Sequence, residues 1–190
     1  MKKIPFLILL LAFIPQFGNS QDLEIPLGKI VDSIPITDTT ANSFALYLPQ
    51  NFNKEKQWPV IFVFDPQGRG SGATQLFRAV AEEQSYIIAA SNLNLKKDSL
   101  KNNINKIGPF INQVDGMLSI DREQVYVAGL SEGGQLAGAL PFIYNNIAGV
   151  LAVENDWINT QYLNANKKLM FSALACDSNN KIIVFYSHIT

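Results

Sequence analysis

The stretch "VYVAGLSEGGQLAG", residues 125–138, passes from a strand pattern into a helix pattern within a single turn. Ser131 stands at the junction, with Gly129 two residues before it and Gly133 two residues after it. A chain that reverses so sharply brings backbone close to both glycines, where a Cβ would collide with the neighbouring strand or helix. The pattern predicts a tight turn that holds the Ser131 side chain above the carboxyl end of a strand. A glycine-bounded turn without any chemistry is the alternative interpretation.

Short apolar runs alternate with longer amphipathic stretches on both sides of this turn. The predicted strands are residues 43–49, 59–64, 86–91, 125–130, 147–155 and 169–176, and the predicted helices begin near Gly72, Pro109 and Glu132. This alternation is typical of a mainly parallel sheet with helices on both faces, so the predicted fold class is α/β. The polar stretch 91–108 has no sustained apolar stripe and is predicted to be a mobile loop with at most one helical turn.

The first twenty residues have the pattern of a secretory signal peptide. Two lysines precede an apolar run from Ile4 to Ile14, and small residues stand before Gln21. A membrane span takes about 20 apolar residues, and this run is shorter. We therefore expect residues 1–20 to be removed and residues 21–190 to form one domain without a membrane span, in a secreted or periplasmic protein.

The charged and metal-binding side chains exclude several classes of partner. The 15 basic and 16 acidic residues are well mixed, and the net charge of -1 offers no basic surface for nucleic acid. Cys176 is the only cysteine and His188 the only histidine. The chain therefore has no disulfide and no cysteine-rich zinc site, and we expect no metal ion.

The residues around Ser131 resemble a known family. The stretch "VYVAGLSEGGQLA" resembles the nucleophile elbow of the α/β-hydrolase superfamily, and "VIFVFDPQGRG", residues 60–70, stands where that family keeps an oxyanion-hole loop. The resemblance covers about residues 43–177 and points to secreted bacterial serine esterases of the feruloyl-esterase and depolymerase type. It implies a serine hydrolase in which Ser131 attacks a small-molecule or carbohydrate-linked ester, and no cofactor is needed.

Two backbone amides are the candidate donors to the oxyanion. The amide of Glu132 is free at the start of a helix, where the positive end of the helix dipole also favours an anion. The resemblance implies a second donor in the loop after Phe64, and because Pro66 has no N–H we favour Gln67, with Gly68 next. The sequence "DPQG" is also ordinary turn chemistry, and the two interpretations are compatible.

The resemblance also implies an acid and a base that follow the serine in the chain. Asp177 follows a predicted strand and matches the position of the acid, Asp156 is the second candidate, and Glu154 is less favoured. The only candidate for the base is His188, which follows Asp177 as the order of the family requires.

The position of His188 is difficult to reconcile with this role. Only four residues, "SNNK", separate Asp177 from the apolar run "IIVFY", whereas a parallel crossover takes about 10 to 12 residues. The run either pairs antiparallel with the strand before it or is a displaced fragment of a longer ending. Antiparallel pairing would carry His188 about 20 Å from the Ser131 turn, at the wrong end of the sheet. Members of the family have a further helix and strand before their histidine, so the chain resembles a hydrolase shortened at its C-terminal edge.

Two functions of different classes follow. The first is a hydrolase that cleaves carboxylic esters through an acyl-enzyme on Ser131. The second is a non-catalytic or degraded hydrolase-like binding domain that lacks a competent histidine. A peptidase is a weaker third interpretation. The distance between His188 and the Ser131 hydroxyl discriminates between the first two.

Overall fold

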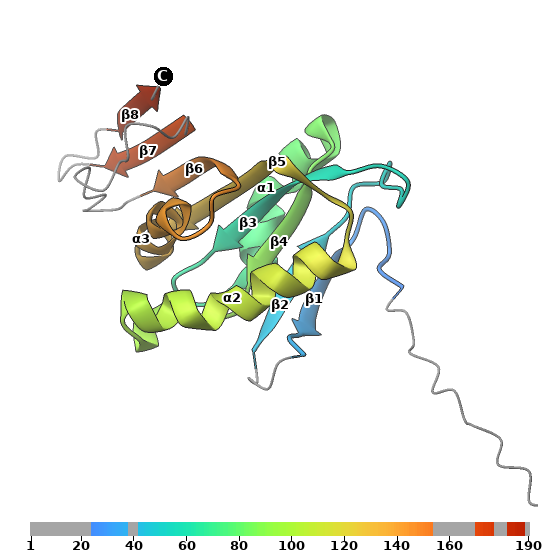
Figure 1. The fold of residues 1–190 in the computed structure, drawn as a ribbon, viewed down its shortest axis with the longest axis horizontal. Helices are drawn as coiled ribbons and strands as arrows, with labels where there is room; N and C mark the ends of the chain where they lie inside the picture. Colours follow the sequence, from blue (N-terminus) through green and yellow to red (C-terminus); the bar gives the residue numbers. More distant parts are fainter. Residues whose placement is uncertain (1–23, 38–41, 154–169, 177–181, 189–190) are drawn as a thin grey trace, which may run out of the picture.

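The computed structural model describes residues 24–37, 42–153, 170–176 and 182–188, and these residues form an eight-stranded sheet with the order β1-β2-β4-β3-β5-β6-β7-β8 (Figure 1). The strands are β1 (Ile30–Pro35), β2 (Ser43–Tyr47), β3 (Trp58–Phe64), β4 (Ile87–Ser91), β5 (Ile120–Leu130), β6 (Ile147–Val153), β7 (Met170–Cys176) and β8 (Ile182–His188). The helices are α1 (Gly70–Gln84), α2 (Leu100–Met117) and α3 (Glu132–Ala139), with short 3-10 turns η1 (Leu95–Lys97) and η2 (Leu140–Phe142).

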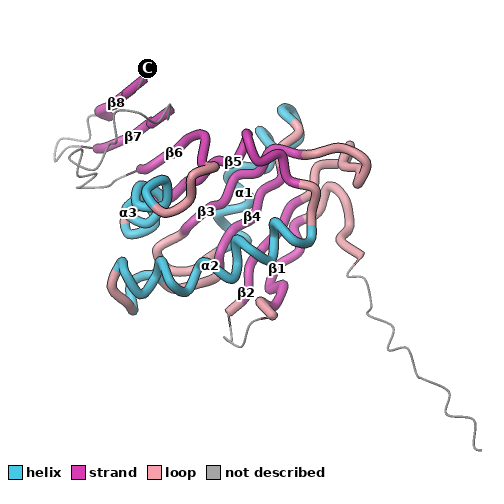
Figure 2. Tube along the Cα trace, viewed as in Figure 1, coloured by secondary structure: helices cyan, strands magenta, loops and turns pink. Residues whose placement is uncertain are grey.

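The sheet is mainly parallel, as the sequence predicts. Strands β4, β3, β5, β6 and β7 run in one direction. Strand β2 runs antiparallel to β4, β1 antiparallel to β2, and β8 antiparallel to β7. Helix α1 covers one face, and α2 and α3 cover the other (Figures 1 and 2). The predicted α/β fold class is therefore confirmed.

Apolar side chains fill both faces of the sheet. On the face of α2 and α3, the ring of Phe110 lies 5.2 Å from that of Phe44 and 5.5 Å from that of Phe62. On the face of α1, Ala73 and Ala81 pack against small and branched side chains of the sheet such as Ala128 and Ile88. Burial on both faces explains why the sequences of β3, β4 and β6 are almost entirely apolar instead of alternating.

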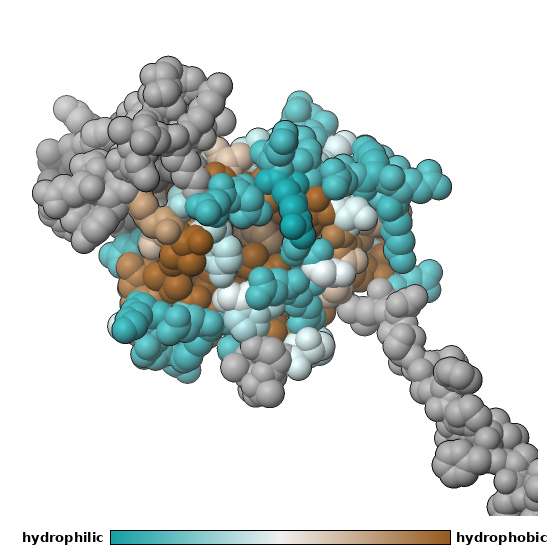
Figure 3. All heavy atoms as spheres, in the orientation of Figure 1, coloured by the Kyte–Doolittle hydropathy of each residue, from teal (hydrophilic) through white to brown (hydrophobic). Residues whose placement is uncertain are grey.

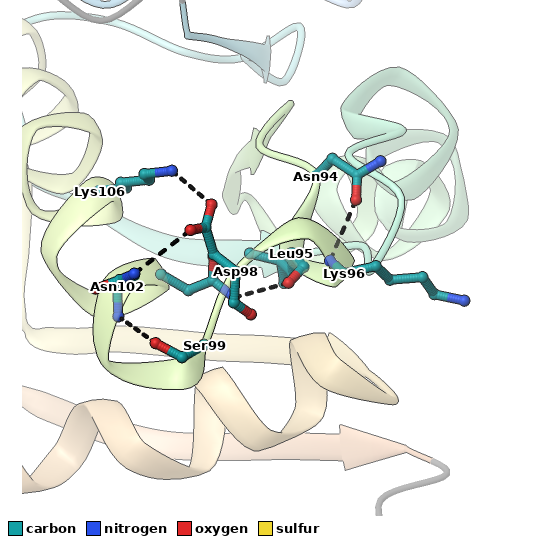
Figure 4. Close-up of polar contacts among 8 residues, drawn as sticks. Asn94, Leu95, Lys96, Asp98, Ser99, Asn102 and Lys106 are labelled. Atoms are coloured by element: carbon teal, nitrogen blue, oxygen red, sulfur yellow. Dashed lines mark hydrogen bonds and ion pairs between the residues drawn. The ribbon is translucent and has the colours of Figure 1, made fainter.

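The prediction of a mobile loop over residues 91–108 is wrong, because helix α2 begins at Leu100 and contains Pro109 in its interior. The Ser99 hydroxyl accepts a hydrogen bond from the Asn102 amide at 3.4 Å and caps the helix. Asp98 forms an ion pair with Lys106 (Figure 4). The buried side chain of Asn103 donates to the Leu95 carbonyl at 2.9 Å. Capping and polar contacts with the preceding turn, which an apolar pattern does not report, stabilise this half of the helix.

The surface of the described residues combines polar helices with a few apolar side chains. Figure 3 shows apolar atoms gathered over α3 and the turn that follows it, where Phe142 and Ile143 are nearly half exposed. On the face of α1, Leu76 is also exposed. Of the helices that the structure describes, none is long and apolar enough to cross a membrane.

Candidate active site

Ser131 occupies a strained turn between β5 and α3. Its φ of 52° and ψ of -121° lie in a region that a residue with a side chain rarely adopts. The Ser131 amide donates to the Val153 carbonyl at 2.8 Å, and the Ser131 carbonyl accepts from the Gln135 amide at 3.0 Å. Such a conformation costs on the order of 1–3 kcal/mol and persists only where its surroundings enforce it. Here the end of β6 and the first turn of α3 hold the residue in place.

The two glycines around Ser131 are required by close backbone contacts. A Cβ on Gly129 would lie 2.0 Å from the carbonyl oxygen of Gly133. A Cβ on Gly133 would in turn lie 2.0 Å from the carbonyl oxygen of Phe64, at the end of the neighbouring strand β3. The predicted collisions at both positions are confirmed. They also show that the turn is fitted against the end of β3, which brings the loop after β3 close to α3.

Asp65 organises the loop that follows β3. Its Oδ1 accepts hydrogen bonds from the amides of Gln67, at 2.9 Å, and Arg69, at 3.2 Å. The Arg69 guanidinium donates to both carboxylate oxygens, at 3.1 Å and 2.9 Å. The Gln67 amide, predicted to be an oxyanion donor, is therefore bonded to a carboxylate. The Gly68 amide, the second candidate, donates to the Asp65 carbonyl at 3.1 Å. No role for the Asp65 side chain was predicted, although an aspartate before Pro-x-Gly is a signal for this kind of turn.

The pKa of Asp65 reflects these contacts. Burial by itself raises the pKa, because a charged carboxylate loses its hydration. The hydrogen bonds from the Arg69 side chain and from the amides of Arg69 and Gln67 outweigh burial and hold the pKa of Asp65 below its ordinary value. The carboxylate is thus a stable anion at the start of the loop.

Glu132 places an acidic side chain in the first turn of α3, directly after Ser131. Its own amide and the Ser131 hydroxyl both stabilise the carboxylate and lower the pKa of Glu132, and partial burial opposes them. The ammonium of Lys96, on η1, also lowers this pKa. Among the residues that the structure describes, none donates a hydrogen bond to the buried carboxylate oxygen Oε2. Only the amide of Glu132 was predicted to have a role, and this amide is one of the groups that lower the pKa of the carboxyl of the same residue.

The register of the sheet separates His188 from Ser131. His188, at the end of β8, pairs with Met170 on β7. Met170 pairs with Gly149 on β6, and Gly149 pairs with Tyr126 on β5. His188 therefore lies in the same row across the sheet as Tyr126. Tyr126 precedes Ser131 by five residues, and β8 lies three strands from β5. At about 3.3 Å per residue and about 4.8 Å per strand, the two backbones lie roughly 20 Å apart. The antiparallel alternative for the run "IIVFY" is the one that the structure adopts.

The candidate acids Asp177, Asp156 and Glu154 lie outside the described residues. Among the residues that the structure does describe, no three His, Cys, Asp or Glu side chains are grouped so that they could hold a metal ion.

An apolar cavity of about 220 Å³ lies beside the Ser131 turn, on the face of α1. Phe64, Gly129, Leu130 and Val153 line it from the carboxyl ends of the strands, and Phe77 lines it from α1. A second cavity of about 260 Å³ lies between α2 and the amino ends of β5 and β6, away from Ser131. Of these two cavities, the first is the one close enough to Ser131 to receive part of a molecule that reacts there.

The sequence matches no protein-family model, and no curated protein is significantly similar to it. Solved structures are similar in fold. A thermophilic carboxylesterase cloned from a metagenomic library has a TM-score of 0.54 at 14% identity, over 70% of this chain and 49% of the esterase. An esterase from Pyrobaculum calidifontis has a TM-score of 0.53 at 15% identity, over 68% of this chain and 46% of the esterase. A thermostable esterase has a TM-score of 0.56 at 12% identity, over 76% of this chain and 46% of the esterase.

These comparisons show a shared architecture. The chain spans about half the length of each of the three esterases. At sequence identities of 12–15%, the similarity to these esterases shows a shared fold and nothing further. The strand order, the parallel centre of the sheet and the helices on both faces agree with that result. The chain therefore has the α/β-hydrolase fold.

Proposed function

We propose that the chain is a secreted serine hydrolase that cleaves carboxylic esters through an acyl-enzyme on Ser131. The observation that carries the proposal is the strained φ of 52° at Ser131, at the carboxyl end of a central parallel strand. A serine held in this way between Gly129 and Gly133 has the geometry of a nucleophile elbow. A merely structural turn gains nothing from such strain, whereas a nucleophile gains exposure above the sheet.

The reaction proceeds in two steps. Ser131 Oγ forms a bond to the acyl carbon, the bond to the alcohol oxygen breaks, and the Oγ proton passes through a base to the leaving alkoxide. Water then cleaves the acyl-enzyme in the same manner. The amide of Glu132, at the start of α3, stabilises the oxyanion of each intermediate.

The substrate is a small ester. The apolar cavity beside the Ser131 turn has a volume of about 220 Å³, which suits a short acyl group. The mixed surface charge of the sequence favours a neutral or small partner over nucleic acid. Secretion rests on the signal-peptide pattern of residues 1–20, which lie outside the described residues.

A non-catalytic hydrolase-like binding domain is the second candidate, and the register of β8 favours it. His188 and Asp177 form the acid–base pair that the family resemblance implies, but His188 pairs with Met170 at the amino end of β7. A serine without a nearby base is a poor nucleophile. Such a protein would keep the turn and the cavity and would bind an ester without hydrolysing it.

Labelling with a fluorophosphonate tests the proposal on the full chain. We expect slow labelling that maps to Ser131 and is lost in Ser131→Ala. A folded wild-type protein that resists labelling would favour the second candidate, the non-catalytic binding domain.

The role of His188 as the base is tested by the rate of ester hydrolysis in His188→Ala. An unchanged rate is expected from the register, and a loss of about 10³-fold would show that His188 is the base after all.

A further inference from the structure

Helix α1 lies behind the sheet in Figure 1, on the face opposite to α2 and α3, and its outer side carries a patch of exposed apolar side chains. The helix packs on the sheet through small buried side chains such as Ala73 and Ala81. On the outer side Leu76 is 82% exposed and Val80 is 47% exposed, and Ala79 beside them is exposed as well. Residues three and four positions apart are neighbours on a helix, so these side chains form one patch. Single exposed apolar side chains are common, whereas a patch of them is typical of an interaction surface.

A charged residue stands at each end of this patch. Arg69 directly precedes α1, and a Cβ added to Gly72 would lie 4.0 Å from the Cβ of Arg69, so the two residues are on the same side of the helix. Glu83 lies two turns after Leu76, and both Arg69 and Glu83 are exposed. We call Arg69, Gly72, Leu76, Val80 and Glu83 the α1 stripe. Its residues are spaced by 3, 4, 4 and 3 positions, so the spacing is the same in both directions from Leu76.

The signs of the two charges are opposite to those that would stabilise α1 by itself. The positive end of the helix dipole lies beside Arg69, and the negative end lies beside Glu83. The first turn of α1 has no acidic residue, and its last turn has no basic one. Two other charges of the helix have partners within the chain, because the Tyr47 hydroxyl donates to the Glu82 carboxylate and the Arg78 guanidinium lies 5.9 Å from the Tyr47 ring. Arg69 and Glu83 are thus placed to suit a partner of the opposite polarity.

The contact of Arg69 with Asp65 leaves room for such a partner. Asp65 accepts hydrogen bonds from Nε and Nη2 of Arg69. The Arg69 side chain remains 60% exposed, and a guanidinium has five N–H donors. A second carboxylate can therefore bind Arg69 while the contact with Asp65 persists.

We propose that the α1 stripe is the contact between two copies of this chain, with their α1 helices antiparallel about a two-fold axis at Leu76. Residues equally far from Leu76 in the sequence then face each other. Val80 of one copy packs on Gly72 of the other, where no side chain takes up the space. Glu83 of one copy pairs with Arg69 of the other. The stripe is complementary to itself, as a two-fold interface requires, and this complementarity favours a second copy over a different protein.

The contact is independent of the chemistry proposed for Ser131, and it is weak. Helix α1 has 15 residues, so it is about 22 Å long. A contact through one such helix from each copy is smaller than the about 1,200 to 2,000 Å² of a stable interface. We therefore expect a reversible dimer with a Kd of roughly 10 to 100 µM. The chain is then a monomer at low micromolar concentration.

Sedimentation equilibrium of the full chain between about 1 µM and 1 mM measures this association. Leu76→Lys places two ammonium groups together at the axis, and we expect it to weaken the dimer at least about tenfold in Kd. Ile143→Lys is the matched control, because Ile143 is 48% exposed and follows η2 on the other face of the sheet. The control should leave Kd unchanged, and circular dichroism should show both variants folded.

The antiparallel register has its own test. Glu83→Arg puts an arginine opposite Arg69 and should weaken the dimer about three- to tenfold, whereas Glu123→Arg, at an exposed glutamate of β5, should have no effect. In a Cys176→Ser background, Leu76→Cys should be joined to the second copy by a bismaleimide whose reach matches the about 8–10 Å between packed helices. Ile143→Cys should give no such product.

Three results would overturn the proposal. The first is a wild-type protein that stays monomeric up to about 1 mM. The second is a dimer whose Kd is unchanged by Leu76→Lys, because its contact must then lie elsewhere. The third is a monomer whose free energy of unfolding is lowered by Leu76→Lys and unchanged by Ile143→Lys, because another segment of the same chain must then cover the α1 stripe.

Discussion

Gly133 lies directly against the end of strand β3, where a Cβ added to it would stand 2.0 Å from the carbonyl oxygen of Phe64. The contact joins the first turn of α3 to the strand that precedes the Asp65 loop. The Ser131 turn and that loop are therefore held at one edge of the sheet by backbone contact. Asp65 and Glu132 are the chain neighbours of the two residues in this contact, so their backbones lie at the same edge.

Replacement of Gly133 by alanine tests this contact. We expect Gly133→Ala to lower the free energy of unfolding by about 1–3 kcal/mol or more, because neither α3 nor β3 can move without loss of other contacts. The measurement is denaturant unfolding followed by circular dichroism. Gly116→Ala, also in a helix, is the control, since a Cβ there meets nothing within 4 Å. The control should be neutral or stabilising by about 0.4–1 kcal/mol.

The Asp65 carboxylate should make stability depend on acid pH. Its pKa is lowered in the folded protein, so its contribution is present above the unfolded pKa of about 3.9 and is lost as the pH falls through the folded value. We expect Asp65→Asn to be less stable at neutral pH by roughly 1.5–3 kcal/mol, through loss of charge-assisted hydrogen bonds. Unfolding curves between pH 7 and pH 2 should converge for the two proteins. Parallel curves would contradict the prediction.

Phe110 connects α2 to the centre of the sheet, and its side chain is fully buried. We expect Phe110→Ala to cost about 3–5 kcal/mol in the free energy of unfolding, because the cavity lies among Phe44, Phe62 and Phe64 and cannot collapse. Thermal and urea denaturation measure the loss. Leu76→Ala removes an apolar side chain that is 82% exposed and should change stability by no more than about 0.5 kcal/mol.

Asn92 links the start of α1 to the edge of the sheet. Its Oδ1 accepts from the Gly70 amide at 3.0 Å, and its Nδ2 donates to the Ser43 hydroxyl at 2.9 Å. We expect Asn92→Ala to lower the free energy of unfolding by about 1–3 kcal/mol, because it leaves a partly buried amide and a hydroxyl without partners. Asn105→Ala, at an exposed position of α2, is the control and should be neutral or slightly stabilising. Equal effects of the two substitutions would exclude the linking role.

Local signals explain the correct predictions from sequence. The apolar runs of β3, β4, β5 and β6 and the spacing of glycines around Ser131 depend only on neighbouring residues. Alternation of strands and helices then limits the topology to a mainly parallel sheet, because parallel neighbours require a crossover. For this reason the α/β class and the turn at Ser131 could be predicted from the amino-acid sequence alone.

The first half of α2 could not be predicted in the same way. Its polar residues give no apolar stripe, and Pro109 is a signal for a helix start. The helix forms there because Asn103 finds a backbone partner in Leu95 and Lys106 pairs with Asp98. Both partners lie in the turn just before the helix, and they meet Asn103 and Lys106 only because the chain turns there into the helix.

The sequence by itself determined the α/β class, the Ser131 turn and the glycines around it, since steric exclusion and apolar periodicity act over a few residues. The tertiary structure decided the direction of β8, which sets the backbone of His188 at the opposite end of the sheet from Ser131. It also decided that the first turn of α3 packs against the end of β3, where a Cβ on Gly133 would lie 2.0 Å from the Phe64 carbonyl oxygen. Strand register and helix packing depend on which segments meet in space, and contacts between residues far apart in the sequence determine both.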